Sequence, residues 1–296
     1  MINSILLTFV QLISKLPLPV CHGLGEVIGT LMYWIPNRNR RDSRTNIDLC
    51  FPHMNAHEKR QLLRRSLIES AKTFMEMPGI WRGDPRRFLD RLDRGDSVEK
   101  IQQLLARGKG LIIAAPHLGS WEGGGSLLSI AAPVTSLYRP PRKKEFDEYI
   151  RNGRFANGNK LAPTNPNGVK TLLKALKKGE IIAILPDQEP KAGGKEAGIF
   201  APFFGTPAFT MVLLNRLATK TGAPVLYAYV ERIKGKACYR FHTLEAPEGI
   251  HDPDPLIAAT ALNQGVENCV RQCPELYQWS YRRFREQPDG GHSRYI

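Results

Sequence analysis

Two short, wholly apolar runs constrain the fold of this chain most strongly. Residues 111–115 lie between Gly110 and Pro116, and residues 181–185 end at Pro186. Continuous apolar runs of this length, bounded by turn residues, are typical of buried β-strands. Further along the chain, segments with helical spacing of apolar residues separate such strands, and this alternation predicts an α/β protein.

The coarse pattern predicts the remaining elements. We expect helices at about 55–77, 97–107, 121–130, 169–178, 210–221 and 254–273, and strands at 134–138, 225–231 and 238–243, the last two as a hairpin through 234–236. Asn55 and Glu58 form a capping-box pattern at the start of the first helix, Phe74 belongs to its expected buried face, and Pro78 is expected to end it. Together these elements predict a mixed, mainly parallel central sheet flanked by helices, in one domain over residues 37–296.

Residues 1–36 form a separate apolar segment. Its first part carries an apolar stripe at helical spacing, and Pro17 and Pro19 then interrupt the run. Neither half has the length of charge-free sequence expected of a spanning helix. Tyr33 and Trp34 close the segment, and four arginines follow within residues 38–44, as in helices that lie in the interface of an anionic membrane. We therefore expect an N-terminal membrane-associating helix, with the body of the protein on the cytoplasmic side. The alternative is an amphipathic helix docked on the protein's own core.

Composition narrows the partners and the compartment. The formal net charge is +14, which favours acidic partners such as anionic lipids, phosphorylated substrates, an acidic carrier protein or nucleic acid. The five cysteines are odd in number and irregularly spaced, without a CxxC pair. A disulfide framework is therefore not expected, and neither is a metal site at Cys269 and Cys273.

The segment that follows the first apolar run carries the candidate chemistry. It leaves a buried strand at Pro116 and enters a helix near Trp121, which is where α/β proteins usually place ligands. Glu122 falls in the first helical turn, where the helix dipole favours an ionised carboxylate. Such a carboxylate is suited to hold one ring nitrogen of His117 and leave the other free as a base. In isolation, His117 is also explained as an ordinary core histidine.

Ser120 offers a rival chemistry, because a serine at a strand-to-helix turn is a candidate nucleophile. The nucleophile elbow needs glycines where this chain has Leu118 and Glu122. We therefore expect Ser120 to cap the helix. A His–acid pair without a protein nucleophile then suits direct attack by a substrate hydroxyl on a thioester.

These residues carry a family resemblance. His117-x4-Glu122 is similar to the H-x4-D/E motif of the glycerolipid acyltransferase superfamily, and the longer context resembles the late acyltransferases of bacterial lipid A biosynthesis, of the lauroyl or myristoyl type. Ser120 stands where many members carry Asn. Blocks that agree in order are NIDLCFP at 46–52, Leu137-Tyr138-Arg139-Pro140, Leu185-Pro186-Asp187-Gln188, Phe203-Phe204-Gly205 and Tyr281-Arg282-Arg283-Phe284.

The resemblance implies an activity and its partners. It implies transfer of an acyl chain from acyl carrier protein to a hydroxyl of a lipid A precursor, at the cytoplasmic face of the inner membrane and without a metal or organic cofactor. Carried onto this chain, His117 is the general base and Glu122 orients it. Arg139 becomes a substrate-binding residue, and Asp187 and Gln188 line the same cleft. The alternative for Arg139 is a surface arginine, and the alternative for Asp187 and Gln188 is ordinary turn residues after Pro186. Residues 142–144 are strongly basic and either meet the carrier protein or form a solvated face.

Two other interpretations stay open. One is a related acyltransferase with a glycerophospholipid or aminolipid acceptor. The other is a non-catalytic basic protein that binds membrane or nucleic acid, although the chain carries no nucleic-acid motif and its basic residues are not interleaved with aromatics.

Overall fold

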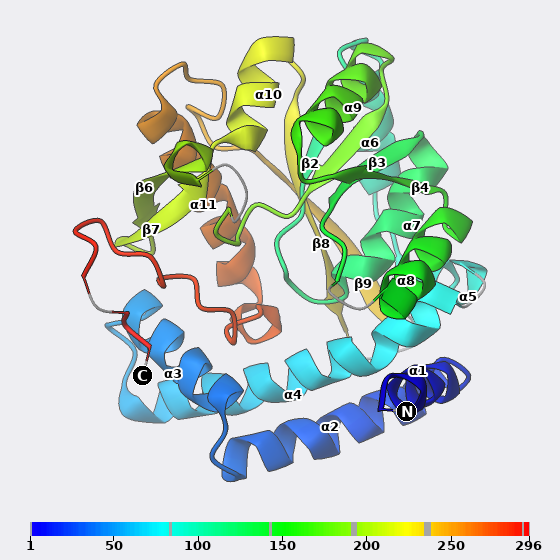
Figure 1. Cartoon of the computed structure of the whole chain (residues 1–296), viewed down its shortest axis with the longest axis vertical. Helices are drawn as coiled ribbons and strands as arrows, with labels where there is room; N and C mark the ends of the chain where they lie inside the picture. The colour runs from blue at the N-terminus through cyan, green and yellow to red at the C-terminus, as the bar shows by residue number, and fades with distance from the viewer. Residues whose placement is uncertain are drawn as a thin grey trace.

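The computed structural model describes residues 2–82, 85–141, 144–190, 194–233, 238–291 and 293–295. A seven-stranded sheet forms its centre. Figure 1 shows the sheet with helices around it. Its strands in spatial order are β1 (Leu92–Asp93), β9 (Tyr239–Glu245), β8 (Val225–Arg232), β2 (Leu111–Ala114), β5 (Ile181–Ile184), β3 (Val134–Tyr138) and β4 (Asn159–Pro163). All neighbours are parallel except β8 and β9. The expected mixed, mainly parallel sheet and its closing hairpin pair are confirmed.

Helices cover both faces of this sheet. Helices α5 (Pro85–Leu89), α6 (Ser97–Leu105) and α7 (Trp121–Ala131) pack on one face, and α9 (Pro166–Lys177), α10 (Leu213–Thr221) and α11 (Pro255–Gln272) pack on the other. Within β2, Leu111 and Ile113 face the α7 layer while Ile112 and Ala114 face the α11 layer, and all four side chains are fully buried. This two-sided burial explains why the strand is apolar throughout.

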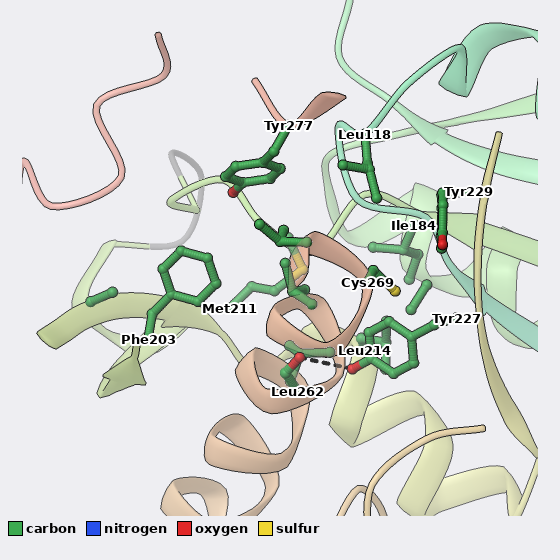
Figure 2. Packing of buried hydrophobic residues seen from close by; sticks show 14 of the residues in the cluster. Leu118, Ile184, Phe203, Met211, Leu214, Tyr227, Tyr229, Leu262, Cys269 and Tyr277 are labelled. Carbon is green, nitrogen blue, oxygen red and sulfur yellow. Dashed lines mark hydrogen bonds between the residues drawn. The ribbon is translucent and has the colours of Figure 1, made fainter. Parts of the chain in front are cut away.

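The larger core lies between the sheet and α11. Figure 2 shows Tyr227 of β8 lying against α11, with its hydroxyl group donating a 2.8 Å hydrogen bond to the carbonyl oxygen of Leu262. Phe203, Met211 and Tyr277 extend this core away from the sheet. Because the phenol hydroxyl is paired, the buried tyrosine costs no unsatisfied polar group.

Three segments differ from expectation. A two-stranded hairpin, β6 (Gly198–Phe203) and β7 (Thr206–Met211), occupies residues where we expected the start of a helix, so α10 begins only at Leu213. Phe204 and Gly205 both have positive φ, as the two-residue turn of such a hairpin requires. Helix α8 (Lys144–Ala156) and edge strand β4 were not predicted. The basic residues 142–143 and the turn at 234–236 lie outside the described residues.

All five cysteines are free thiols.

Helix α4 (Ala56–Arg82) starts where it was predicted to start but extends past its predicted end. The side chain of Asn55 accepts from the backbone N–H groups of residues 57 and 58, and Glu58 accepts from that of Asn55, which confirms the capping box. The expected end at Pro78 is wrong, because the helix runs on to residue 82. Helix α8 contacts this last turn, where the Tyr149 hydroxyl donates to the Pro78 carbonyl. Phe74 is exposed rather than buried.

The N-terminal segment forms α1 (Ile2–Ile13) and α2 (Leu18–Trp34), followed by α3 (Arg38–Cys50). Helix α2 lies along α4, as Figure 1 shows, and it approaches so closely that a Cβ on Gly29 would lie 2.3 Å from the Cα of Ile68. Among the described residues, no helix has both the length and the apolarity to cross a membrane. The division of the chain into a membrane-associating segment, residues 1–36, and a domain, residues 37–296, stays a prediction.

A buried ionic cluster ties α2 and α4 to the sheet. Glu76 of α4 has a fully buried carboxylate, which accepts from the Tyr239 hydroxyl at 2.8 Å, lies 2.8 Å from Nε2 of His22 and accepts from Arg232 at 3.3 Å. Burial would raise the pKa of Glu76, but the Arg232 charge and the hydrogen bond with His22 outweigh it and lower this pKa. The carboxylate therefore stays ionised at neutral pH and depends on its partners.

Removing one partner of this cluster should destabilise the fold. Arg232→Met leaves Glu76 buried with its main counter-charge gone, and breaking such a pair costs about 3–5 kcal/mol. The free energy of unfolding, measured by urea denaturation, reports the loss. The control is Arg240→Met, which breaks an exposed pair with Asp93 and should leave the unfolding curve unchanged. Equal effects of the two substitutions would contradict the structural role of the cluster.

Candidate active site

The loop between β2 and α7 is held by backbone contacts on several sides. The N–H of Gly119 donates to the carbonyl oxygen of Leu276, and that of Ser120 donates to the carbonyl oxygen of Val230. Thr73 of α4 places its hydroxyl 3.2 Å from the carbonyl oxygen of Gly119. Gly119 has φ +62°, and a Cβ there would lie 1.9 Å from the Val230 oxygen, so only glycine fits. The loop therefore presents His117 in one fixed position.

His117 meets the polar pair that follows the neighbouring strand. Nδ1 of its ring lies 2.9 Å from Oδ1 of Asp187, and its backbone N–H donates to Oδ2 at 3.0 Å. The side-chain nitrogen of Gln188 lies 3.1 Å from Nε2. These contacts arise because β2 and β5 are parallel neighbours, so the residues after their carboxyl ends share one edge of the sheet.

The charge state of Asp187 fixes the histidine tautomer. Burial would raise the pKa of Asp187, but the adjacent His117 ring and its hydrogen bonds outweigh burial and lower that pKa. An ionised carboxylate only accepts hydrogen bonds, so Nδ1 of His117 carries the proton. Nε2 is then a hydrogen-bond acceptor, turned toward the Gln188 amide. A ring held in this way is suited to remove a proton.

Glu122 lies in the first turn of α7, as expected, but its partners differ from those expected. Its carboxylate accepts from Nε1 of Trp81 at 2.8 Å and from both Nε and Nη2 of Arg154. The carboxylate hydrogen-bonded to the His117 ring is that of Asp187, not that of Glu122. Burial would raise the pKa of Glu122, and the charge of Arg154 outweighs it and lowers this pKa. A catalytic role for Glu122 stays a prediction.

Arg154 is a site residue that sequence reasoning missed. It comes from α8, a helix that was not predicted, and its guanidinium group also lies 4.9 Å from the ring centre of Tyr138. The Tyr138 hydroxyl in turn donates to Asp147 at 2.7 Å. The only sequence signal was the position of Tyr138, which directly precedes Arg139 in one of the recognised blocks.

A cavity of about 910 Å³ joins these residues. His117, Glu122, Arg139 and Gln188 line it, so the structure brings four of the five predicted site residues to one space, with Asp187 buried behind His117. Two basic side chains that were not predicted also line it, Lys170 of α9 and Arg216 of α10, and both are exposed, as is Arg139.

Ser120 does not play its expected part. It occupies the N-cap position of α7, but its side chain makes no capping hydrogen bond. The prediction of a cap through the hydroxyl group is therefore wrong, and the backbone N–H of Ser120 bonds to β8 instead.

The ring of Trp121 packs edge-on against the imidazole of His117, with 5.2 Å between the ring centres.

Comparison with known proteins decides the family. A family model described as bacterial lipid A biosynthesis acyltransferase matches residues 1–286. The chain belongs to the bacterial lipid A biosynthesis acyltransferase family. It is similar to the lipid A biosynthesis lauroyltransferase of Escherichia coli (strain K12), with 29% identity over 96% of this chain and 91% of the relative. The palmitoleoyltransferase of the same organism is 28% identical over 95% and 90%, and a Haemophilus influenzae lipid A biosynthesis acyltransferase is 28% identical over 90% and 82%.

Family membership makes this protein an acyltransferase and gives the cavity a chemical context. Acyl transfer needs a base for the attacking group and space for an acyl chain. In this lipid A biosynthesis acyltransferase, the cavity that His117 lines has both polar and apolar walls. Arg154 and Trp81 hold Glu122 at the same cavity, so its charge is balanced before any substrate enters.

The ion pair of Glu122 should be visible in the pH dependence of stability. Since the pKa of Glu122 is lowered in the folded protein, its stabilising contribution is present above the ordinary glutamate pKa of about 4.3 and is lost as the pH falls through the lowered folded value. Denaturant titrations between neutral and acid pH should show a shallower loss of stability below this pH for Glu122→Gln than for wild type. An unchanged slope would contradict the lowered pKa.

Proposed function

We propose that this protein transfers a fatty acyl chain from acyl carrier protein to a hydroxyl group of a lipid A precursor, as a secondary acylation in lipopolysaccharide biosynthesis. The observation that carries the proposal is the His117 ring, with Nδ1 bonded to a buried carboxylate and Nε2 at the cavity. The names of the E. coli relatives, a lauroyltransferase and a palmitoleoyltransferase, agree with a fatty acyl donor.

The proton steps follow from this geometry. Nε2 of His117 takes the proton of the acceptor hydroxyl while the alkoxide oxygen attacks the thioester carbonyl. Asp187 stabilises the imidazolium that forms. The tetrahedral intermediate then collapses, the C–S bond breaks, and the leaving thiolate receives the proton from the imidazolium. The Gln188 amide, 3.1 Å from Nε2, yields its place to the hydroxyl and is near enough to donate to the developing oxyanion. No step needs a cofactor.

The outer end of the cavity is suited to phosphorylated substrates. Arg139, Lys170 and Arg216 come from three elements and all line it. Phosphate groups are present in a lipid A precursor and in the prosthetic arm of a carrier protein, and arginine binds them through paired hydrogen bonds. The net charge of +14 also favours encounter with an acidic carrier protein.

The outer side of α1 and α2 supports membrane association at the cytoplasmic face. Large apolar side chains project from it into solvent, while the other side of α2 packs on α4. They are Phe9, Leu12, Leu16, Val20, Leu24, Val27, Ile28, Leu31, Trp34 and Ile35. Exposed Arg38, Arg41 and Arg44 follow in α3, next to this face. An apolar face beside a basic cluster is suited to the interface of an anionic bilayer.

The base assignment is tested by substitution of the histidine. His117→Ala should lower kcat/KM for acyl transfer by about 10²–10⁴, because a positioned general base contributes that factor. Asp187→Asn should impair the same step through the wrong tautomer. The measurement is mass spectrometry of a disaccharide lipid A precursor incubated with acyl carrier protein loaded with a fatty acid. A monoacyl glycerophosphate offered in parallel tests the alternative acceptor.

A matched control accompanies these two variants. Asn167→Ala changes an exposed residue of α9 and should transfer at the wild-type rate. All variants are checked for folding by thermal melting. Transfer by folded His117→Ala at the wild-type rate would end the assignment of the base, and acylation of only the glycerophosphate would end the assignment of the acceptor.

The membrane proposal is tested on α2. Val27 and Leu31 lie one turn apart on the exposed side, and burying such a side chain contributes about 1.5–3 kcal/mol. The double substitution to Asp should therefore lower affinity for vesicles containing phosphatidylglycerol at least tenfold, measured by flotation. Leu256→Asp with Ile257→Asp changes an equally exposed apolar pair on α11 and should have no effect. Equal loss in both double variants would argue against a specific membrane face.

A further inference from the structure

The cavity continues from His117 as an inner arm between α7 and the central sheet. Its walls are mostly apolar side chains and glycines, namely Ile113, Ala183, Ala228 and Val230 of the sheet and Gly124, Gly125 and Leu128 of α7, and Ser136 of β3 also lines the cavity. Gly124 and Gly125 leave space on the α7 side, and Ala183 and Ala228 leave space on the sheet side. A Cβ on Gly124 would lie 3.4 Å from Cγ2 of Val230, in ordinary contact, so a methyl group would fit there and narrow the arm.

Asn159 lies at the inner end of this arm. It is the first residue of β4 and pairs with Val134, whereas Tyr138, at the other end of β3, lies beside Arg154 and the catalytic loop. The four residues that separate Val134 from Tyr138 span about 13 Å at about 3.3 Å per residue. Asn159 lines the cavity from the level of the sheet at which β3 begins.

The Asn159 amide is a polar group with an unpartnered oxygen in this mostly apolar surrounding. The residue is only 5% exposed, and its Oδ1 has no hydrogen-bond partner among the described residues. Its Nδ2 lies 2.8 Å from where a Cβ on Gly125 would be, so the amide packs directly over α7. Buried amide oxygens almost always have a partner, and a water molecule in a roomy cavity can supply one.

We propose that Asn159 sets the upper limit of acyl chain length by forming a polar floor to the inner arm, an inference that rests on the proposed transfer of a fatty acyl chain. A chain that ends short of the amide leaves it hydrated. A chain that reaches it removes the water and leaves a buried amide unpaired. The energetic penalty of an unpaired group of this kind corresponds to about 5-fold to 150-fold in affinity.

The test uses the full-length protein and a ladder of saturated donors that differ by two carbons. Asn159→Leu keeps the branched shape and the number of side-chain heavy atoms and removes the amide. For the shortest donor that is too long for wild type to use, this variant should raise kcat/KM about 5-fold to 150-fold. Asn159→Ala removes the amide and shortens the side chain, so it should shift the limit in the same direction, and a thermal melt checks that the variant folds. The matched control Gly124→Ala narrows the arm and should shift the preference to shorter chains while raising the melting temperature, because alanine favours a helix over glycine.

Binding of the free fatty acids, measured by calorimetry, separates this inference from the proposed function. If Asn159→Leu extends the longest fatty acid bound but no donor is transferred by wild type, the polar floor stands and the proposed function fails. If wild type transfers acyl chains and both Asn159 variants keep its length limit in transfer and binding, the polar floor is overturned. A shift of both Asn159 variants toward shorter chains would overturn it as well.

Discussion

The parallel pairing of β2 with β5 is the constraint on which the candidate site depends. It brings the residues after the two strands to one edge, so that His117 receives Asp187 at Nδ1 and Gln188 at Nε2. A one-residue slip between two strands that are buried on both faces would exchange their core-facing sides, so the packing of both layers fixes the register. The position of the His117 ring is thus maintained by the core rather than by the loop alone, and Gly119 holds the loop against β8.

The two buried carboxylates near the His117 ring, Asp187 and Glu122, differ in their partners. Asp187 is paired with the histidine itself, whereas Glu122 is paired with Arg154, a permanent cation. Desolvation acts on both acids in the same direction, and in each case a different partner overcomes it. Asp187 is hydrogen-bonded to the imidazole and is therefore placed to stabilise it as an imidazolium. Glu122 interacts with His117 through charge alone, and its hydrogen bonds go to Arg154 and Trp81.

The sequence predicted what local pattern determines. Apolar runs located β2 and β5, the motif located His117 and Glu122 in one cavity, and the recognised blocks placed Asp187 and Gln188 beside them. It did not predict which acid bonds the histidine, because that choice depends on strand order, and strand order is set by crossovers that leave no local signal. Arg154 was missed for the same reason: a basic residue on an amphipathic helix acquires a role only when the fold buries it.

Helix α4 links the proposed membrane face to the catalytic loop. Thr73 and Glu76 lie three residues apart on one side of this helix, so they face the same direction. Thr73 reaches the carbonyl of Gly119 in the loop, Glu76 reaches His22 in α2, and Arg232 bonds to both of them. Because these side chains are buried or partly buried and bonded to one another, displacement of α2 would break contacts that also position the loop. If the acceptor comes from a bilayer, as proposed, these contacts couple the position of His117 to that of α2.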